Sequence, residues 1–181
     1  DYVFLRSSFG PIEEMRNNIV RDALRQGCTH LLLMDTDQVY PVDTITRLLS
    51  HRLPVVGALL FRRYPPFDPL MLTGDMTKYS TISEWTDGEL VEVDATGTGC
   101  VLYDMDVFKR IPDPWFRFRK TVEGSEIGED IGFCHDLRKA GIKIYVDTGV
   151  KVGHLTKMTV DQATWELYKL SKECARRNKE D

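Results

Sequence analysis

The chain has 181 residues, of which 42% are hydrophobic and 10% aromatic, which is enough for a substantial core. Its 24 Lys and Arg residues are scattered among 28 Asp and Glu residues, which argues against a nucleic-acid partner. No apolar run approaches the roughly 18 residues of a membrane span, and no signal-peptide pattern opens the chain. We therefore expect one domain, residues 1–181, in the cytoplasm and without a membrane span.

The cysteines lie far apart and none forms a C-x-x-C pair, which predicts free thiols in a reducing compartment. They are Cys28, Cys100, Cys134 and Cys174.

Strands and helices are predicted to alternate in the first third of the chain, because short apolar runs are separated by helical periodicity. The expected elements are a strand at 2–6, a helix from Pro11 to Gly27, a strand at 29–34, a helix at 42–51 and a strand at 54–61.

The middle of the chain is predicted to be rich in short strands. Residues 62–69, RRYPPFDP, are too proline-rich for regular structure and predict a loop. Short strands are expected around Asp87-Gly88, and a strand-like run at 89–103 is interrupted by glycines that bring the backbone close to another group. Residues 104–111 predict a short helix, and 112–128 predict a mobile loop.

The last third predicts a helix, two strands and a final helix. These elements are a helix at 129–140, strands at 142–147 and 150–155, and a helix from Thr159 to about Asn178. Without internal repeats, this alternation predicts a three-layer α/β/α fold with a mainly parallel central sheet.

Two aspartates follow the buried strand HLLLM directly, in the stretch HLLLMDTDQVY. Like charges this close are costly unless a cation, a shared proton or open water compensates them. Asp35 and Asp37 lie where ligands collect in open α/β sheets, beyond the carboxyl ends of the strands. In an extended segment they would face one way, which suits Mg²⁺ or Mn²⁺ carrying a diphosphate. A solvated turn or a helix cap is the alternative.

Three further residues carry chemistry near the C-terminus, in GEDIGFCHDLRKAGIKIYVDTGVKVGH. Glu129 and Asp130 stand at a predicted helix start, where capping is the simple alternative. His154 ends an apolar strand, and alone it would be read as a core histidine.

In their order along the chain, these motifs resemble the GT-A glycosyltransferases, particularly the large inverting family two. The resemblance runs from MRNNIV through THLLLMDTDQVYPVDTITRLL and GTGCVLYDMDVFKRI to the segment that ends at His154. It implies a metal-dependent enzyme that moves a sugar from a nucleotide-diphosphate sugar to the hydroxyl of a glycan or other acceptor.

The resemblance also implies roles for single residues. Asp35, Asp37 and His154 would hold Mn²⁺ or Mg²⁺, with Asp35 also contacting the nucleotide. Asp130 would be the general base for the acceptor hydroxyl, with Glu129 beside it.

Four other residues would bind the donor by the same resemblance. Arg16 and Asn17 match an "RN" pair near the donor nucleotide, and Gly97 and Gly99 would line the donor-sugar pocket with backbone. The family begins with a further strand and helix that hold the nucleotide base. This chain enters at the second strand, so it is either a fragment or recognises the base differently.

Other residues of the predicted loops have two interpretations each. Trp115 is either a platform for an acceptor sugar or an exposed loop anchor. Arg62 and Arg63 could reach phosphate, but a solvated loop is favoured.

Two other functions compete with the glycosyltransferase hypothesis. LLLMDTDQV also resembles the first motif of haloacid dehalogenase phosphatases, but a strand and a helix precede it here, and that family gives His154 no role. A catalytically silent domain that binds sugar nucleotides or glycans is the third hypothesis. Turnover, as opposed to binding, separates it from an enzyme.

Overall fold

The computed structural model describes residues 1–7, 9–121, 123–157 and 161–177, the last six of them as helix backbone only. Its described helices are α1 (Ile12–Arg25), α2 (Thr44–Ser50), α3 (Asp106–Arg110), α4 (Glu129–Lys139) and α5 (Gln162–Arg177). Its longer strands are β1 (His30–Met34), β3 (Val55–Leu59), β4 (Met71–Gly74), β6 (Leu90–Val93), β8 (Cys100–Asp104) and β11 (Ile144–Lys151). Its short strands are β2 (Gln38–Val39), β5 (Tyr79–Thr81), β7 (Ala95–Thr96), β9 (Arg119–Lys120), β10 (Glu126–Ile127) and β12 (Gly153–His154).

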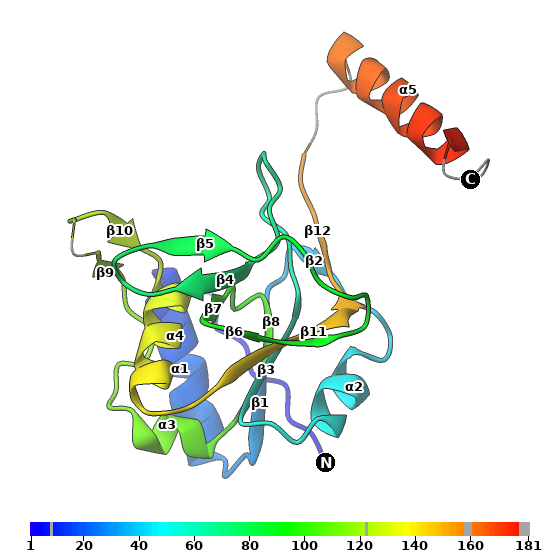
Figure 1. Cartoon of the computed structure of the whole chain (residues 1–181). Helices are drawn as coiled ribbons and strands as arrows, with labels where there is room; N and C mark the ends of the chain where they lie inside the picture. Colours follow the sequence, from blue (N-terminus) through cyan, green and yellow to red (C-terminus); the bar gives the residue numbers. More distant parts are fainter. Residues whose placement is uncertain (8, 122, 158–160, 178–181) are drawn as a thin grey trace.

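A five-stranded sheet in the order β1-β8-β3-β11-β6 forms the centre of the molecule (Figure 1). Only β3 and β11 pair in parallel, and the other three pairings are antiparallel. The fold is therefore mixed α/β, and the predicted mainly parallel sheet is wrong. The cause is β8, which runs between β1 and β3 in the opposite direction to both.

The three strands β1, β3 and β11 nevertheless point the same way, since β1 and β3 are both antiparallel to β8. Their carboxyl ends therefore meet at one edge of the sheet. This edge carries the residues that follow each strand, and it places the candidate site.

Apolar side chains alternate between the two faces of the sheet, as in a strand covered on both sides. On β3, Val55 and Leu59 join the larger core cluster, while Val56 and Ala58 join the smaller one. The larger cluster includes residues of α1, α3 and α4, whereas α2 contributes Leu48 to the smaller one. The predicted three-layer α/β/α fold needs a layer of helices on each face of the sheet. Because α2 is short, the layer on its face is not confirmed as complete.

Two predicted elements are wrong. Residues 2–6 form no strand, and Tyr2 and Phe4 are exposed; an apolar run becomes a strand only beside a neighbour that accepts its hydrogen bonds. The predicted mobile loop at 112–128 contains the β9–β10 hairpin and contributes to the core.

Trp115 belongs to that core and is neither a sugar platform nor an exposed anchor. It is only 4% exposed, and its indole N–H donates to the carbonyl oxygens of Phe108 and Ile111 at 2.9 and 2.8 Å. Its ring meets that of Phe108 edge to face. These contacts satisfy both the apolar and the polar part of the indole.

The other predicted helices and the strands 29–34, 54–61, 142–147 and 150–155 have counterparts, with ends that shift by a few residues. The predicted ends of the last helix, Thr159 and Asn178, lie outside the described residues. Cys28, Cys100 and Cys134 are free thiols, and the side chain of Cys174 is not described. Within the described ranges, no helix is long and apolar enough to cross a bilayer.

Candidate active site

Asp35 and Asp37 follow β1 at the sheet edge where β1, β3 and β11 end. They lie in a turn and not in an extended segment, so their side chains are free to take different partners. The backbone N–H of Asp35 donates to the carbonyl oxygen of Gly99 at 3.0 Å, and Asp35 O accepts from the Tyr40 hydroxyl at 2.5 Å. Gly99 and Tyr40 thus fix the turn.

Gly99 is closely covered by the side chain of Gln38. A Cβ atom there would lie 2.1 Å from Nε2 of Gln38, so a larger residue would require the Gln38 side chain to move. Gly97 is similarly tight against Leu70, and its Cβ would also lie 3.8 Å from Oδ2 of Asp130. Of the two glycines predicted to line a sugar pocket, Gly99 therefore lies beside the turn and Gly97 lies beside Asp130.

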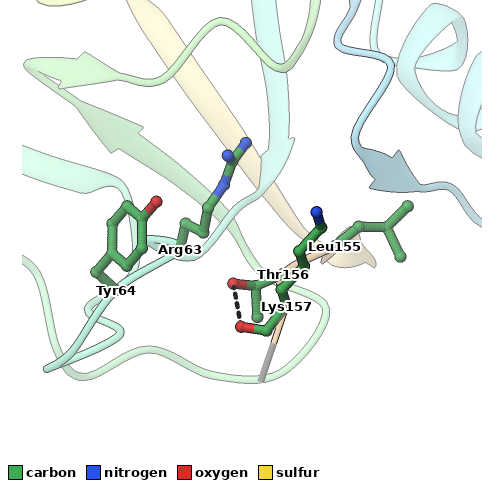
Figure 2. A pocket seen from close by; sticks show the side chains of 5 residues that line it. All are labelled: Arg63, Tyr64, Leu155, Thr156 and Lys157. Atoms are coloured by element: carbon green, nitrogen blue, oxygen red, sulfur yellow. Dashed lines mark hydrogen bonds between the residues drawn. The ribbon is translucent and has the colours of Figure 1, made fainter. Parts of the chain in front are cut away.

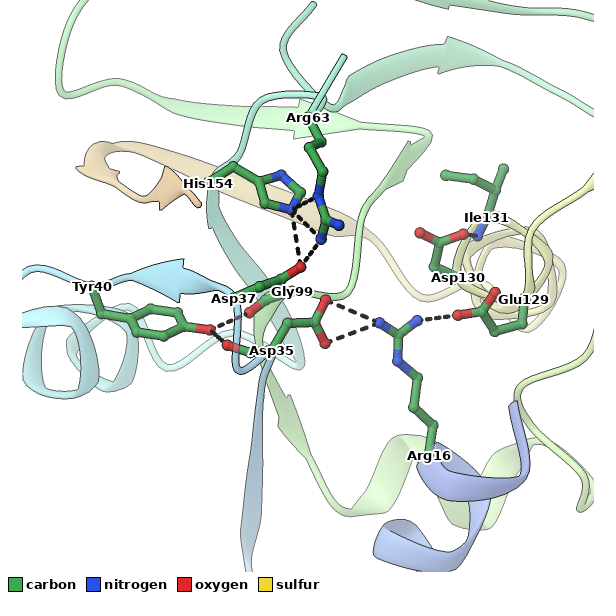
Figure 3. Close-up of polar contacts among 10 residues, drawn as sticks. All are labelled: Arg16, Asp35, Asp37, Tyr40, Arg63, Gly99, Glu129, Asp130, Ile131 and His154. Atoms are coloured by element: carbon green, nitrogen blue, oxygen red, sulfur yellow. Dashed lines mark hydrogen bonds and ion pairs between the residues drawn. The ribbon is translucent and has the colours of Figure 1, made fainter. Parts of the chain in front are cut away.

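Arg16 lies between two carboxylates from different elements (Figure 3). Its Nη2 is 3.2 Å from Oδ1 of Asp35, and its Nη1 forms a short contact with Oε1 of Glu129 at the start of α4. We call these residues, Arg16, Asp35 and Glu129, the Arg16 cluster. The side chains of Arg16 and Glu129 are only 9% exposed, whereas that of Asp35 is 36% exposed.

Burial and opposite charge compete at this cluster. Burial lowers the pKa of Arg16, but the carboxylates of Asp35 and Glu129 outweigh it and raise that pKa above its usual value. Burial raises the pKa of Glu129, although Arg16 beside it acts in the opposite direction.

Asp130 stands beside the Arg16 cluster on the first turn of α4. Its Oδ1 accepts the N–H of Ile131 at 2.8 Å, so part of the capping alternative holds. Burial raises the pKa of Asp130, and the charge of Arg16 only partly offsets this effect. A carboxylate with a raised pKa is a stronger base once it has lost its proton.

Asp37 and His154 come together because β2 and β12 pair antiparallel, with His154 opposite Gln38. His154 Nε2 is 3.6 Å from Oδ2 of Asp37, and Nδ1 lies 3.0 Å from the carbonyl oxygen of Phe61. Because a carbonyl accepts only, Nδ1 is the nitrogen that carries a proton toward Phe61 O.

Arg63 lies between Asp37 and His154, where its guanidinium contacts Oδ2 of Asp37. Its Nε and Nη2 lie 3.3 and 3.2 Å from Nε2 of His154. We call Arg63, Asp37 and His154 the Arg63 cluster. Arg63 lies on a loop with its side chain 37% exposed, as predicted for a solvated loop residue, but its guanidinium is also paired with Asp37 and His154.

Two open cavities of about 440 and 360 Å³ adjoin Arg63. Figure 2 shows the larger one between the loop that carries Arg63 and Tyr64 and the segment Leu155–Lys157. The smaller one is lined by Arg62 and His154 among others.

Asn17 lies outside this constellation. Its amide nitrogen donates to Phe116 O at 2.8 Å, and its amide oxygen accepts the N–H groups of Trp115 and Phe116, both at 3.0 Å. The side chain is buried and joins α1 to the loop before β9. Its amide is thus committed to the protein backbone.

Sequence reasoning missed the positions of Arg63 and Tyr40. Arg62 and Arg63 are adjacent and chemically identical, so no local signal shows which of them enters the site. For Tyr40, the signal available was its place directly after β2, where a hydroxyl can reach back to the turn.

No family model matches the chain, and no curated protein matches its sequence. Among solved structures, the chain is similar to A197 from STIV, with a TM-score of 0.56 and 18% identity over 87% of this chain and 73% of that one. It is also similar to GalNAc-T7, in a crystal structure with UDP, GalNAc and Mn²⁺. That match has a TM-score of 0.59 and 14% identity, over 81% of this chain and 31% of GalNAc-T7. At these identities the likeness concerns the fold.

Proposed function

We propose that this chain transfers a sugar from a nucleotide-diphosphate sugar to an acceptor hydroxyl, using Mn²⁺ or Mg²⁺. One observation supports this most: three distant segments of the sequence bring Asp35 and Asp37, Asp130, and His154 to one end of the sheet, in a fold similar to GalNAc-T7. Catalysis of this reaction needs a cation at the leaving diphosphate and a base at the incoming hydroxyl.

Asp37 and His154 are the residues that would hold the cation. No group of three or more His, Cys, Asp or Glu suited to a metal occurs among the described residues, but these two side chains converge. Two protein ligands fit Mg²⁺ or Mn²⁺, which commonly take one or two protein donors together with substrate phosphates. The hydrogen bond from Nδ1 to Phe61 orients the His154 ring, as for many metal-bound histidines. When bound, the metal would neutralise charge that develops on the diphosphate.

Asp130 is better suited to be the base than Glu129. Glu129 is held by Arg16, so its carboxylate serves to position that arginine. Among the described residues, no arginine forms an ion pair with the carboxylate of Asp130, and burial raises its pKa. It would take the proton of the acceptor hydroxyl as the new glycosidic bond forms.

A silent binding domain is the second candidate, because each aspartate of the D-x-D motif is already paired with an arginine. Such a domain would bind a sugar nucleotide or glycan without turnover. It predicts no effect of Asp130 on any reaction.

The first experiment is a screen of nucleotide sugars with Mn²⁺, read as thermal stabilisation and as hydrolysis or transfer. A ligand at 100 times its Kd adds roughly 2.7 kcal/mol to the free energy of unfolding. Asp37→Ala and His154→Ala should abolish metal-dependent donor binding in folded protein. Asp43→Ala removes an exposed carboxylate near the same turn and is the matched control.

Asp130→Asn separates the two candidates. It retains the size of the side chain and its bond to Ile131, but it loses basicity. We expect donor affinity to remain and transfer to fall by roughly 10²–10⁴-fold. Full transfer in this variant would show that Asp130 is not the base, and absence of any transfer by the wild type in the screen would favour the binding domain.

A further inference from the structure

The guanidinium of Arg63 contacts the two atoms that the proposed function assigns to the metal. These atoms are Oδ2 of Asp37 and Nε2 of His154. A guanidinium carries only N–H donors, so Nε2 of His154 accepts from Arg63, and Nδ1 is the nitrogen that donates to Phe61 O. The guanidinium thus contacts both the carboxylate of Asp37 and the imidazole of His154.

A metal ion and Arg63 cannot share these atoms. Mn²⁺ or Mg²⁺ would bind the same carboxylate oxygen and imidazole nitrogen at close to 2 Å, using the lone pairs that now accept N–H groups of Arg63. Each cation therefore excludes the other, and the affinity for the metal is reduced by the free energy of the Arg63 contacts.

The surroundings of Arg63 allow it to leave. Its side chain and that of Asp37 are each 37% exposed, and Arg63 lies on the irregular segment between β3 and β4. The two cavities that adjoin it are open, and their lining includes Arg62, Tyr64 and Lys157. A displaced guanidinium would remain near two other cations, in a region that favours an anion.

We infer that Arg63 is an internal competitor of the divalent cation, which keeps Asp37 and His154 paired until metal and diphosphate arrive together. The inference rests on the proposed function and adds regulation to the same site. When the metal binds alone, it displaces Arg63, and no new partner of the guanidinium compensates for the lost contacts with Asp37 and His154. With a diphosphate present, the released guanidinium gains an anionic partner, so metal and nucleotide assist each other's binding.

Titration with Mn²⁺ alone, in which electron paramagnetic resonance reports the free ion, tests the inference without activity. We compare the wild type with Arg63→Gln, Arg63→Lys and Arg62→Gln, after thermal melting has shown that each variant is folded. Arg62→Gln is the matched control, because it removes the same charge from the adjacent, exposed position.

Arg63→Gln should bind Mn²⁺ roughly three- to tenfold more tightly than the wild type, the order expected for the loss of one half-exposed ion pair. Arg62→Gln and Arg63→Lys should stay within about twofold, since the first retains the competitor and the second its charge. Equal tightening in Arg63→Gln and Arg62→Gln would mean a general charge effect and would overturn the inference.

Two other outcomes separate this inference from the proposed function. If the wild type binds Mn²⁺ and Arg63→Gln binds it equally or more weakly, Arg63 is not a competitor, but the metal site stands. If neither the wild type nor any variant binds Mn²⁺, the metal dependence of the proposed function is itself wrong, and the competitor with it.

Discussion

The Arg16 cluster and the Arg63 cluster have similar composition and different burial. Each places an arginine between an aspartate of the D-x-D motif and a residue from the C-terminal part of the chain. Arg16 projects from the 14-residue helix α1 and is nearly inaccessible, whereas Arg63 projects from an irregular segment and is 37% exposed. One arginine is fixed by its helix and its burial, and the other is exchangeable.

The difference between the two clusters predicts different roles for Asp35 and Asp37, which the sequence alone does not distinguish. A buried charge pair depends on both partners, because the remaining charge cannot be hydrated when one is removed. A half-exposed pair contributes little to stability, because water and salt replace the lost partner. The two aspartates are almost equally exposed, at 36% and 37%, so the difference lies in their arginine partners. We therefore expect Asp35, which is held by the buried Arg16, to act mainly as scaffold, and Asp37 to bind under the proposed function.

The largest effect on stability is expected for Arg16→Gln. The change leaves Glu129 buried without its partner, so the free energy of unfolding should fall by about 3–5 kcal/mol. Arg21→Gln is the control on the same helix, because Arg21 pairs with Asp113 on the surface and its loss should cost about 1 kcal/mol or less. Urea unfolding of both variants checks this. Equal losses would remove the distinction between buried and exposed pairs.

Asp35→Asn should have an intermediate effect. The variant retains the backbone bonds to Gly99 and Tyr40 but weakens the interaction with Arg16, which then relies on Glu129. We expect a loss of about 1–2 kcal/mol, in the range of hydrogen bonds to charged groups. A loss as large as that of Arg16→Gln, again in urea, would show that Asp35 and not Glu129 is the main partner.

The pH dependence of stability tests whether Arg16 fully compensates its neighbours. Burial raises the pKa of Asp130 in the folded state, so the folded protein holds this proton more tightly than the unfolded chain does. The stabilisation that comes from this tighter proton binding is fully present below about pH 4, the pKa of the carboxyl in the unfolded chain. It is lost as the pH rises through the higher pKa that Asp130 has in the folded state. In Asp130→Asn the side-chain amide carries no charge at any of these pH values, so the variant lacks this pH dependence.

The stability of Asp130→Asn relative to the wild type should therefore increase as pH rises from about 4 to 7. Unfolding in urea at several pH values measures it. A relative stability that decreases over this interval would mean that the pKa of Asp130 is lowered in the folded state, and that Arg16 dominates over burial.

The positions of β1 and β3 were predictable from the sequence, but strand directions were not. HLLLM and VVGALL are apolar runs whose burial follows from composition, and the place of Asp35 after β1 follows with them. The direction of β8 depends on the path of the chain through β4 to β7, which no local pattern encodes. β8 accounts for two of the three antiparallel pairings of the central sheet, and β6 accounts for the third.

Long-range packing also explains why Trp115 was misjudged. Its burial depends on α3 and on the amide of Asn17, about a hundred residues away. Arg62 and Arg63 are adjacent residues of one type, and no local pattern shows that Arg63 pairs with Asp37.

The two members of the exposed cluster differ in how they could be found. Asp37 was singled out by its place after the strand at 29–34, whereas His154, at the end of an apolar strand, was assigned to the same site only by the family resemblance.

The smallest effect is expected for Asp37→Asn and Arg63→Gln, the pair that defines the exposed side of the comparison. Each variant should change the free energy of unfolding by less than about 1 kcal/mol, and a double-mutant cycle should give a coupling of about 0.2–1 kcal/mol. Because salt screens exposed charges, this coupling should shrink when the ionic strength is raised from about 0.05 to 0.5 M. Thermal and urea unfolding of the four proteins provide the cycle. A coupling above about 2 kcal/mol that resists salt would mean that Arg63 is fixed as firmly as Arg16, and an arginine held that firmly could not give way to a metal ion.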